Sequence, residues 1–269
     1  MRISKKLRGS FSVAEFTNVK NFEVAGMSFL LTEEGRFQYS PMTTLGLPVA
    51  LVCGLAAASY EFPEQKQAIL DALTPFQIVS KIWSSQCAQD IMRMEDSDET
   101  RHIVHVGSWF GQQSALMVRS GAYYDWSVQL VDKDPEACRV AAALLRMDSY
   151  HRRAKPVITP RDIFELETFA PGTTFVWNGL EHFEPADVEK FLDRNSECAF
   201  VFQSTSMPAT DHNNLAFCVD DILKAVPAGW DDGIVYKGEL QTELGSRFMM
   251  AILGPGFDPG AGAEDDEEE

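Results

Sequence analysis

The chain has 269 residues and a formal net charge of −17, and 45% of its residues are hydrophobic. This length suits one large domain, or one domain with an added cap, and the composition is that of a soluble globular protein. A surface this acidic repels phosphates, which disfavours nucleic acid as a partner. Six of the negative charges belong to the terminal run Glu264–Glu269.

No segment predicts a membrane span or a signal peptide. The longest apolar stretch, Leu45–Ala58, is interrupted by two glycines and a proline, and it is shorter than the roughly 20 residues that cross a bilayer. The five cysteines include no close pair, which favours buried thiols in a reducing compartment over disulfides or zinc ligation. We therefore expect a cytoplasmic protein without membrane contact.

The first part of the chain predicts a hairpin between less regular segments. Residues 1–26 are expected to be irregular or weakly structured. Met27–Leu31 and Arg36–Tyr39 flank a Glu-Glu-Gly turn, which is typical of a hairpin.

Helices are expected to follow this hairpin. Pro48–Ser59 predicts an apolar helix, and a second helix begins at Thr74-Pro75, where a capping residue precedes proline. Apolar residues then recur every three or four positions, so this second helix buries one face. The charged run Glu95–Glu99 marks a boundary, and residues 1–99 are expected to form an N-terminal cap.

From Ile103 onward, apolar runs alternate with amphipathic stretches. This alternation predicts an α/β fold in which a doubly wound, mostly parallel sheet carries helices on both faces. The last two strands are joined through Gly245 and are expected to pair antiparallel, which gives seven strands over residues 100–254. The Gly-, Pro- and acid-rich residues 255–269 predict a disordered tail. Strands are expected at 103–107, 127–132, 155–159, 173–178, 198–203, 232–240 and 246–253, and helices at 112–121, 135–147, 185–194 and 212–226.

The segment Arg101–Arg139 is the most informative part of the sequence. It contains a first apolar run, the turn Gly107-Ser-Trp-Phe-Gly111, a helical stretch and a second apolar run that ends in Asp132. This order is typical of a nucleotide-binding α/β unit. A dinucleotide site has a glycine where this chain has Trp109, which argues against NAD or FAD. A nucleoside cofactor without phosphate does not require that glycine.

At this turn the chain resembles the class I S-adenosylmethionine-dependent methyltransferases, some of which carry Gly-x-x-x-Gly with a bulky middle residue. The resemblance covers roughly residues 100–254. It implies S-adenosylmethionine as the cofactor, with Asp132 accepting hydrogen bonds from the ribose and Asp162 accepting one from the adenine. The cofactor contacts expected on this basis are His105, Gly107, Ser108, Trp109, Gly111, Asp132, Lys133, Asp162, Ile163 and Asn178.

Five of these residues also have structural interpretations. Gly107 and Gly111 can form a tight strand-to-helix turn that binds no ligand. Asp132 can cap the following helix, although Asp134 is better placed for that role. Asp162 can likewise cap the segment that follows it. Trp109 can line the cofactor or the substrate, or it can be a core aromatic residue.

Two departures from the family's pattern concern charge. Many members have an acid two residues before the first glycine, where this chain has His105, and a neutral imidazole accepts a hydrogen bond without supplying negative charge. In the metal-dependent branch, carboxylates end the fourth and fifth strands. The corresponding residues here are Asn178 and Gln203-Ser204, so no magnesium site is expected.

Candidate catalytic residues follow the predicted fourth strand. Methyl transfer to oxygen or nitrogen needs an aligned nucleophile and usually a base, and histidine suits that role near neutral pH. His182 is the first candidate, followed by His212 and Glu181. The alternative is that these loop residues have no catalytic role.

The leading hypothesis is therefore S-adenosylmethionine-dependent methyl transfer to a small-molecule or protein acceptor. A second hypothesis is a catalytically inactive methyltransferase-like protein that acts as a binding or structural module, because fold alone does not determine function. A third is another enzyme on the same nucleoside-binding fold, such as an aminopropyl transferase or a lyase. The sequence leaves the acceptor and the oligomeric state open.

Overall fold

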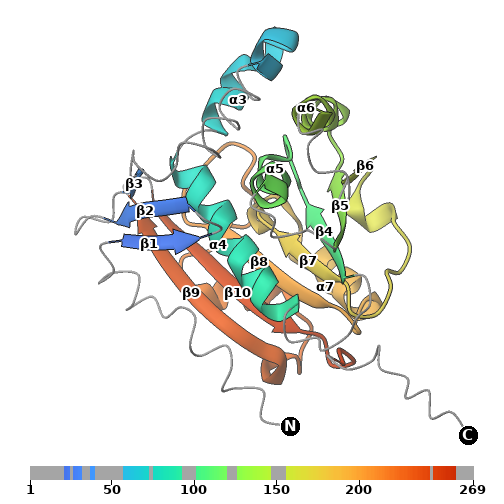
Figure 1. Ribbon diagram of the computed structural model, residues 1–269. Helices are drawn as coiled ribbons and strands as arrows, with labels where there is room; N and C mark the ends of the chain where they lie inside the picture. Colours follow the sequence, from blue (N-terminus) through green and yellow to red (C-terminus); the bar gives the residue numbers. More distant parts are fainter. Residues whose placement is uncertain are drawn as a thin grey trace, which may run out of the picture.

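The computed structural model describes residues 21–24, 27–31, 37–39, 57–72, 75–92, 101–119, 126–146, 156–242 and 245–258. These residues contain a seven-stranded sheet with helices on both faces, and a three-stranded sheet formed by residues near the N-terminus (Figure 1).

The large sheet has the predicted seven strands. Its strand order is β6-β5-β4-β7-β8-β10-β9. The first five strands in this order are parallel, whereas β10 is antiparallel to both β8 and β9. The prediction of a mostly parallel sheet with an antiparallel C-terminal pair is confirmed. The bounds are β4 Arg101–Val106, β5 Trp126–Asp132, β6 Val157–Pro160, β7 Thr174–Trp177, β8 Ala199–Thr205, β9 Ile234–Thr242 and β10 Gly245–Leu253.

Burial along the strands follows their place in the sheet. Every residue of β7 and β8 is buried, as expected for central strands that are covered on both faces. The edge strand β6 has no buried residue. The apolar runs in the sequence therefore mark the interior strands most clearly.

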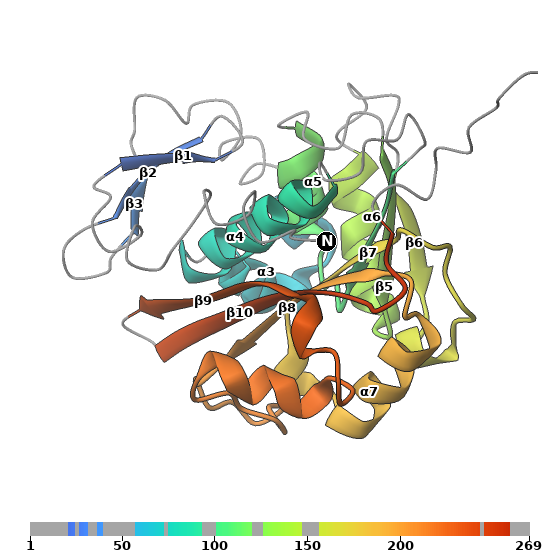
Figure 2. The ribbon, with the colours of Figure 1, turned by 90° about the horizontal axis from the view of Figure 1, so that it is seen from below.

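Neighbouring residues on a strand point to opposite faces, so the sheet has two cores. On one face, Val176 and Val201 pack with α4 (Pro75–Met92) and α6 (Pro135–Arg146). On the other face, Phe175, Phe200 and Phe202 pack with α7 (Pro185–Arg194) and with the 3-10 helix η6 (Val219–Ala225). Figure 2 shows α4 and α5 (Gln112–Arg119) on one side of the sheet and α7 on the other.

Helix α4 packs directly on the large sheet, although the sequence places it in the N-terminal region. The Trp83 indole donates a hydrogen bond to the Tyr236 hydroxyl on β9 (3.0 Å), and the Gln203 amide on β8 donates to the Ser80 carbonyl (2.7 Å). The core of the sheet thus includes a helix that precedes the predicted boundary. The division at residue 99 stays a prediction.

The N-terminal residues differ in part from expectation. The hairpin is confirmed as β2 (Met27–Leu31) paired antiparallel with β3 (Phe37–Tyr39). The prediction of irregular structure over residues 1–26 was wrong at β1 (Asn21–Val24), which pairs with β2. Its sequence Asn-Phe-Glu-Val alternates polar and apolar residues, which is typical of a strand.

Two short helical elements between the predicted N-terminal helices were not expected. They are η3 (Pro63–Gln65) and α3 (Lys66–Asp71). Residues 57–61 are helical, whereas 48–56 of the predicted apolar helix lie outside the described residues. The charged run 95–99 and residues 259–269 of the tail also lie outside them.

The helix predicted at 212–226 is absent over its first half. Residues 212–218 form bends and irregular backbone, and only η6 is helical. The backbone N–H groups of Asn213 and Asn214 donate to the Glu181 carbonyl at 2.9 and 3.1 Å, and that of Ala216 donates to Thr205 at 3.1 Å. These long-range bonds replace the i−4 bonds of a helix, because the segment packs against the loop after β7.

Among the described cysteines, Cys87, Cys138 and Cys198 are buried, as expected, whereas Cys218 is exposed at the start of η6. Cys53 lies outside the described residues. Within the described ranges, no helix has the length and apolar character needed to cross a membrane.

Candidate active site

A cavity of about 900 Å³ lies at the carboxyl ends of the parallel strands, where α/β sheets bind ligands. The ends of β4 and β5 contribute Val106 and Val131, and the loops after β6, β7 and β8 contribute further residues. The N-terminal region reaches the cavity through Asp71 and Gln77. Most of the predicted site residues line it, namely Gly107, Trp109, Asp132, Lys133, Asp162, Ile163, Asn178, His182 and His212.

The turn after β4 has an unusual backbone. Gly107, Trp109 and Gly111 have φ values of +60°, +49° and +67°, a region that costs little for glycine but is strained for a bulky residue. A Cβ on Gly111 would lie 3.2 Å from the Ala141 side chain and 3.3 Å from that of Leu130. Glycine at position 111 therefore lets the turn pack closely against α6 and β5.

Asp132 holds this turn in place from the neighbouring strand. Its Oδ2 accepts a hydrogen bond from the Trp109 backbone N–H at 2.7 Å, and its Oδ1 accepts one from the Asp134 N–H at 2.9 Å. Burial raises the pKa of Asp132, and these two bonds oppose that shift. A carboxylate has about four lone-pair positions, so Asp132 keeps acceptor capacity on the cavity side. Asp134, as expected, is the residue that caps α6, through the Glu136 N–H at 2.8 Å.

Asp162 has the capping role that the sequence offered as the alternative to adenine binding. Its Oδ1 accepts a hydrogen bond from the Phe164 N–H at 3.0 Å, which makes it the N-cap of a short 3-10 helix (Ile163–Glu165). Asp162 and Ile163 nevertheless both line the cavity. The cap fixes the position of this loop at the cavity wall.

Asn178 is tied to α4 through a polar network. Its amide nitrogen donates to the Gln113 side-chain oxygen. The Gln113 amide nitrogen in turn donates to Ser85 Oγ at 2.6 Å and to the Lys81 carbonyl at 3.2 Å. His105 also contacts Gln113, and burial lowers the pKa of His105 to about 3, so its imidazole is neutral. His105 is 1% exposed and, like Ser108 and Gly111, is not part of the cavity lining.

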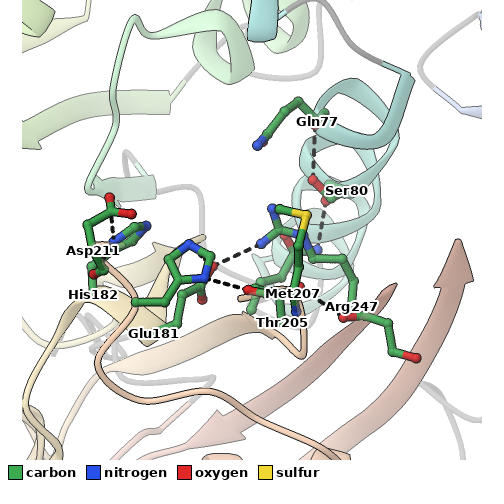
Figure 3. Close-up of polar contacts among 11 residues, drawn as sticks. Gln77, Ser80, Glu181, His182, Thr205, Met207, Asp211 and Arg247 are labelled. Atoms are coloured by element: carbon green, nitrogen blue, oxygen red, sulfur yellow. Dashed lines mark hydrogen bonds and ion pairs between the residues drawn. The ribbon is translucent and has the colours of Figure 1, made fainter. Parts of the chain in front are cut away.

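The three candidate catalytic side chains lie close together, as Figure 3 shows for Glu181 and His182. The rings of His182 and His212 meet edge to face with centroids 4.8 Å apart. His182 Nδ1 lies 3.2 Å from the Asp211 carbonyl oxygen and 3.3 Å from its carboxylate. His212 Nδ1 donates to the Met207 carbonyl at 2.7 Å, and its Nε2 lies 4.0 Å from Glu181 Oε1.

Two buried cations beside Glu181 were missed in the sequence. Arg247 on β10 is 4% exposed and its Nη1 lies 3.3 Å from Glu181 Oε1. Lys81 on α4 is 5% exposed, and its pKa is lowered to about 7 by burial and then by the charge of Arg247, against an opposing effect of Glu181. Each is the single basic residue of its element. Lysine and arginine are rarely buried unless they have a partner.

No protein-family model matches the sequence, and no curated protein matches it. Among solved structures, the chain is similar to the plantazolicin methyltransferase BpumL in complex with SAH, with 10% identity, a TM-score of 0.51, and coverage of 77% of this chain and 96% of that one. It also matches magnesium protoporphyrin IX methyltransferase (ChlM) from Synechocystis PCC 6803 with bound SAM, at 13% identity, a TM-score of 0.47, and coverage of 68% and 83%. At this identity the likeness concerns the fold. Together with the strand order, it shows that the chain has the Rossmann-like fold of the class I S-adenosylmethionine-dependent methyltransferases.

Proposed function

We propose that this protein binds S-adenosylmethionine in the cavity and transfers its methyl group to a small-molecule or protein acceptor. The observation that carries the proposal is the position of Asp132, whose carboxylate grips the turn after β4 and still faces a cavity of about 900 Å³. That volume is within the range of ligand pockets. The plantazolicin methyltransferase with the same fold contains SAH.

The cavity lining suits the adenosine part of this cofactor. Asp132 retains lone pairs for the ribose hydroxyls, and Asp162 and Ile163 lie on the next loop along the sheet edge, where an adenine would lie. Gly107 also lines the cavity and places no side chain in it. The lining also holds four aspartates against one lysine and one arginine, and this negative balance favours a positively charged sulfonium.

The acceptor would occupy the end of the cavity near His182 and His212. His182 is the first candidate for the base, because its ring lines the cavity and is oriented by the Asp211 carboxylate, 3.3 Å from Nδ1. Gln77 and Asp71 of the N-terminal region line the same cavity and would contact either ligand. The acidic chain disfavours nucleic acid, so we propose a small-molecule or protein acceptor and a cytoplasmic location.

Calorimetric titration with S-adenosylmethionine and S-adenosylhomocysteine tests the cofactor assignment. Asp132→Asn is expected to weaken binding by about 10- to 100-fold, because it removes a charged acceptor worth roughly 1.5–3 kcal/mol. Asp134→Asn is the matched control, since that neighbouring carboxylate caps α6 and does not line the cavity.

No binding by the unmodified protein at millimolar ligand would refute the proposal. Tight binding without turnover on any hydroxyl- or amine-bearing acceptor would instead favour the catalytically inactive alternative.

A further inference from the structure

We propose that Glu181, His182 and His212 bind a divalent first-row transition metal ion, with Zn²⁺ as the natural choice for this ligand set. One potential ligand atom from each residue lies within 4.8 Å of the other two. The sequence predicts no magnesium site, because the fourth and fifth strands do not end in carboxylates. Two imidazoles and one carboxylate favour a different class of cation.

Both histidines are held in the way that metal-binding histidines usually are. His212 donates its Nδ1 proton to the Met207 carbonyl, at 2.7 Å, and this leaves the lone pair on Nε2. His182 Nδ1 faces the carbonyl and carboxylate oxygens of Asp211, at 3.2 and 3.3 Å. A backbone carbonyl or carboxylate on the second ring nitrogen fixes the tautomer and raises the basicity of the ligating nitrogen.

Glu181 supplies a buried carboxylate oxygen to the cluster. The residue is 2% exposed, and its Oε1 interacts with Arg247 at 3.3 Å. Its Oε2 has no hydrogen-bond partner within the described part of the chain. Leaving a buried charged acceptor unpaired is costly, and a cation between Glu181 and the two imidazoles removes that cost.

The charges around the cluster are compatible with a dication. Asp211 adds a second carboxylate behind His182. Arg247 already has Glu181 as its counter-ion, with its Nη1 3.3 Å from Glu181 Oε1. In Figure 3, Glu181 lies between the His182–Asp211 pair and Arg247, and its Oε1 is 3.3 Å from Arg247 Nη1 and 4.0 Å from His212 Nε2.

The site would keep coordination positions open toward the cavity. Three protein ligands leave at least one position free on zinc, and His182 and His212 both line the cavity. A hydroxyl bound at that position would have a lowered pKa, so the metal would replace a histidine as the means of deprotonating an acceptor. This consequence rests on the proposed function, whereas the metal site itself rests on the three side chains.

Metal binding is measured on the full chain after treatment with a chelator. Co²⁺ is titrated and followed by its visible absorption, and Zn²⁺ is then added to displace it. The measurements use a Cys218→Ser background, because the exposed Cys218 thiol is a competing zinc ligand. We expect one ion per chain. His182→Ala is expected to weaken binding by at least about 100-fold, and Asp211→Asn, which removes only an outer partner, by about 10-fold or more.

The matched control is His102→Ala, which removes an exposed histidine from β4 and is expected to leave binding unchanged. Glu181→Gln, which keeps the side-chain shape, is expected to weaken binding as His182→Ala does. No binding of either ion, or equal binding by the His182→Ala and His102→Ala variants, would overturn the proposal. Calorimetry with S-adenosylhomocysteine on the metal-free protein separates this failure from failure of the cofactor assignment.

Discussion

Replacing the buried Lys81 is expected to stabilise the protein and to remove part of its pH dependence. Lys81 is 5% exposed, and burial, followed by the charge of Arg247, lowers its pKa from 10.5 to about 7. This difference corresponds to roughly 5 kcal/mol of preference for the neutral amine in the folded protein, at about 1.4 kcal/mol per pKa unit. Lys81→Met keeps the length of the side chain and the helix propensity while removing the charge.

The direction of the pH effect follows from the number of protons bound. Between about pH 7 and the unperturbed pKa of 10.5, the unfolded chain carries a proton on Lys81 that the folded chain lacks. The free energy of unfolding of the unmodified protein therefore rises with pH in this window, by up to about 1.4 kcal/mol per pH unit from this group. Below about pH 7 both states are protonated and this group contributes no slope.

Urea unfolding of both proteins measures the effect. At about pH 6, Lys81→Met is expected to be more stable by about 1–4 kcal/mol, and this advantage should shrink by about 2 kcal/mol between pH 7 and pH 9. Lys190→Met, which removes a lysine with a 75% exposed side chain, is the control and should show no such change. Parallel pH profiles for the unmodified protein and Lys81→Met would refute the assignment of a buried, readily deprotonated lysine.

Three further outcomes are expected. Gly111→Ala should lower the free energy of unfolding in urea by about 1–3 kcal/mol, because φ is +67° and the new Cβ would lie 3.2 Å from a side chain of α6. Gly229→Ala, where φ is +90° and no atom lies within 4 Å, should cost only about 1 kcal/mol, and equal costs would contradict crowding at Gly111. Trp83→Phe should lower the free energy of unfolding by about 1–3 kcal/mol, because it leaves the Tyr236 hydroxyl unpaired. The double variant with Tyr236→Phe should lose less than the sum of the two single variants. Additive losses in thermal unfolding would argue against this hydrogen bond. Iodoacetamide should label Cys218 before the buried thiols, as judged by peptide mass, and uniform labelling of the folded protein would contradict the burial pattern.

The sheet was predictable because its strands are short apolar runs separated by helical periodicity. β8 illustrates this, since each of its residues is buried and its sequence is largely apolar. The turn at Gly107–Gly111 was likewise predictable, because two glycines at this spacing between an apolar run and a helix have few other uses. The assignment of Asp132 and Asp162 to a cofactor stays a prediction, since no ligand contact tests it.

The parts that were not predictable depend on contacts between distant residues. Asn213 and Asn214 were expected in a helix, but the Glu181 carbonyl takes their N–H groups, and no local pattern encodes that bond. The burial of Lys81 and Arg247 requires α4 and β10 to meet around Glu181. These two elements lie far apart in the chain. Local propensity is overridden in such places by tertiary contacts.

The position of β10 determines when the large sheet can be completed during synthesis. This strand follows all other described strands in the chain, yet it lies inside the sheet between β8 and β9. During synthesis, β9 therefore leaves the ribosome before the strand that joins it to the remainder of the sheet. Until those nine residues dock, β8 is an open edge available to foreign strands, and Glu181 lacks its arginine. A nascent chain halted before Gly245 would expose the edge of β8 and would leave Glu181 without Arg247. Chaperones and proteases would therefore act on it readily.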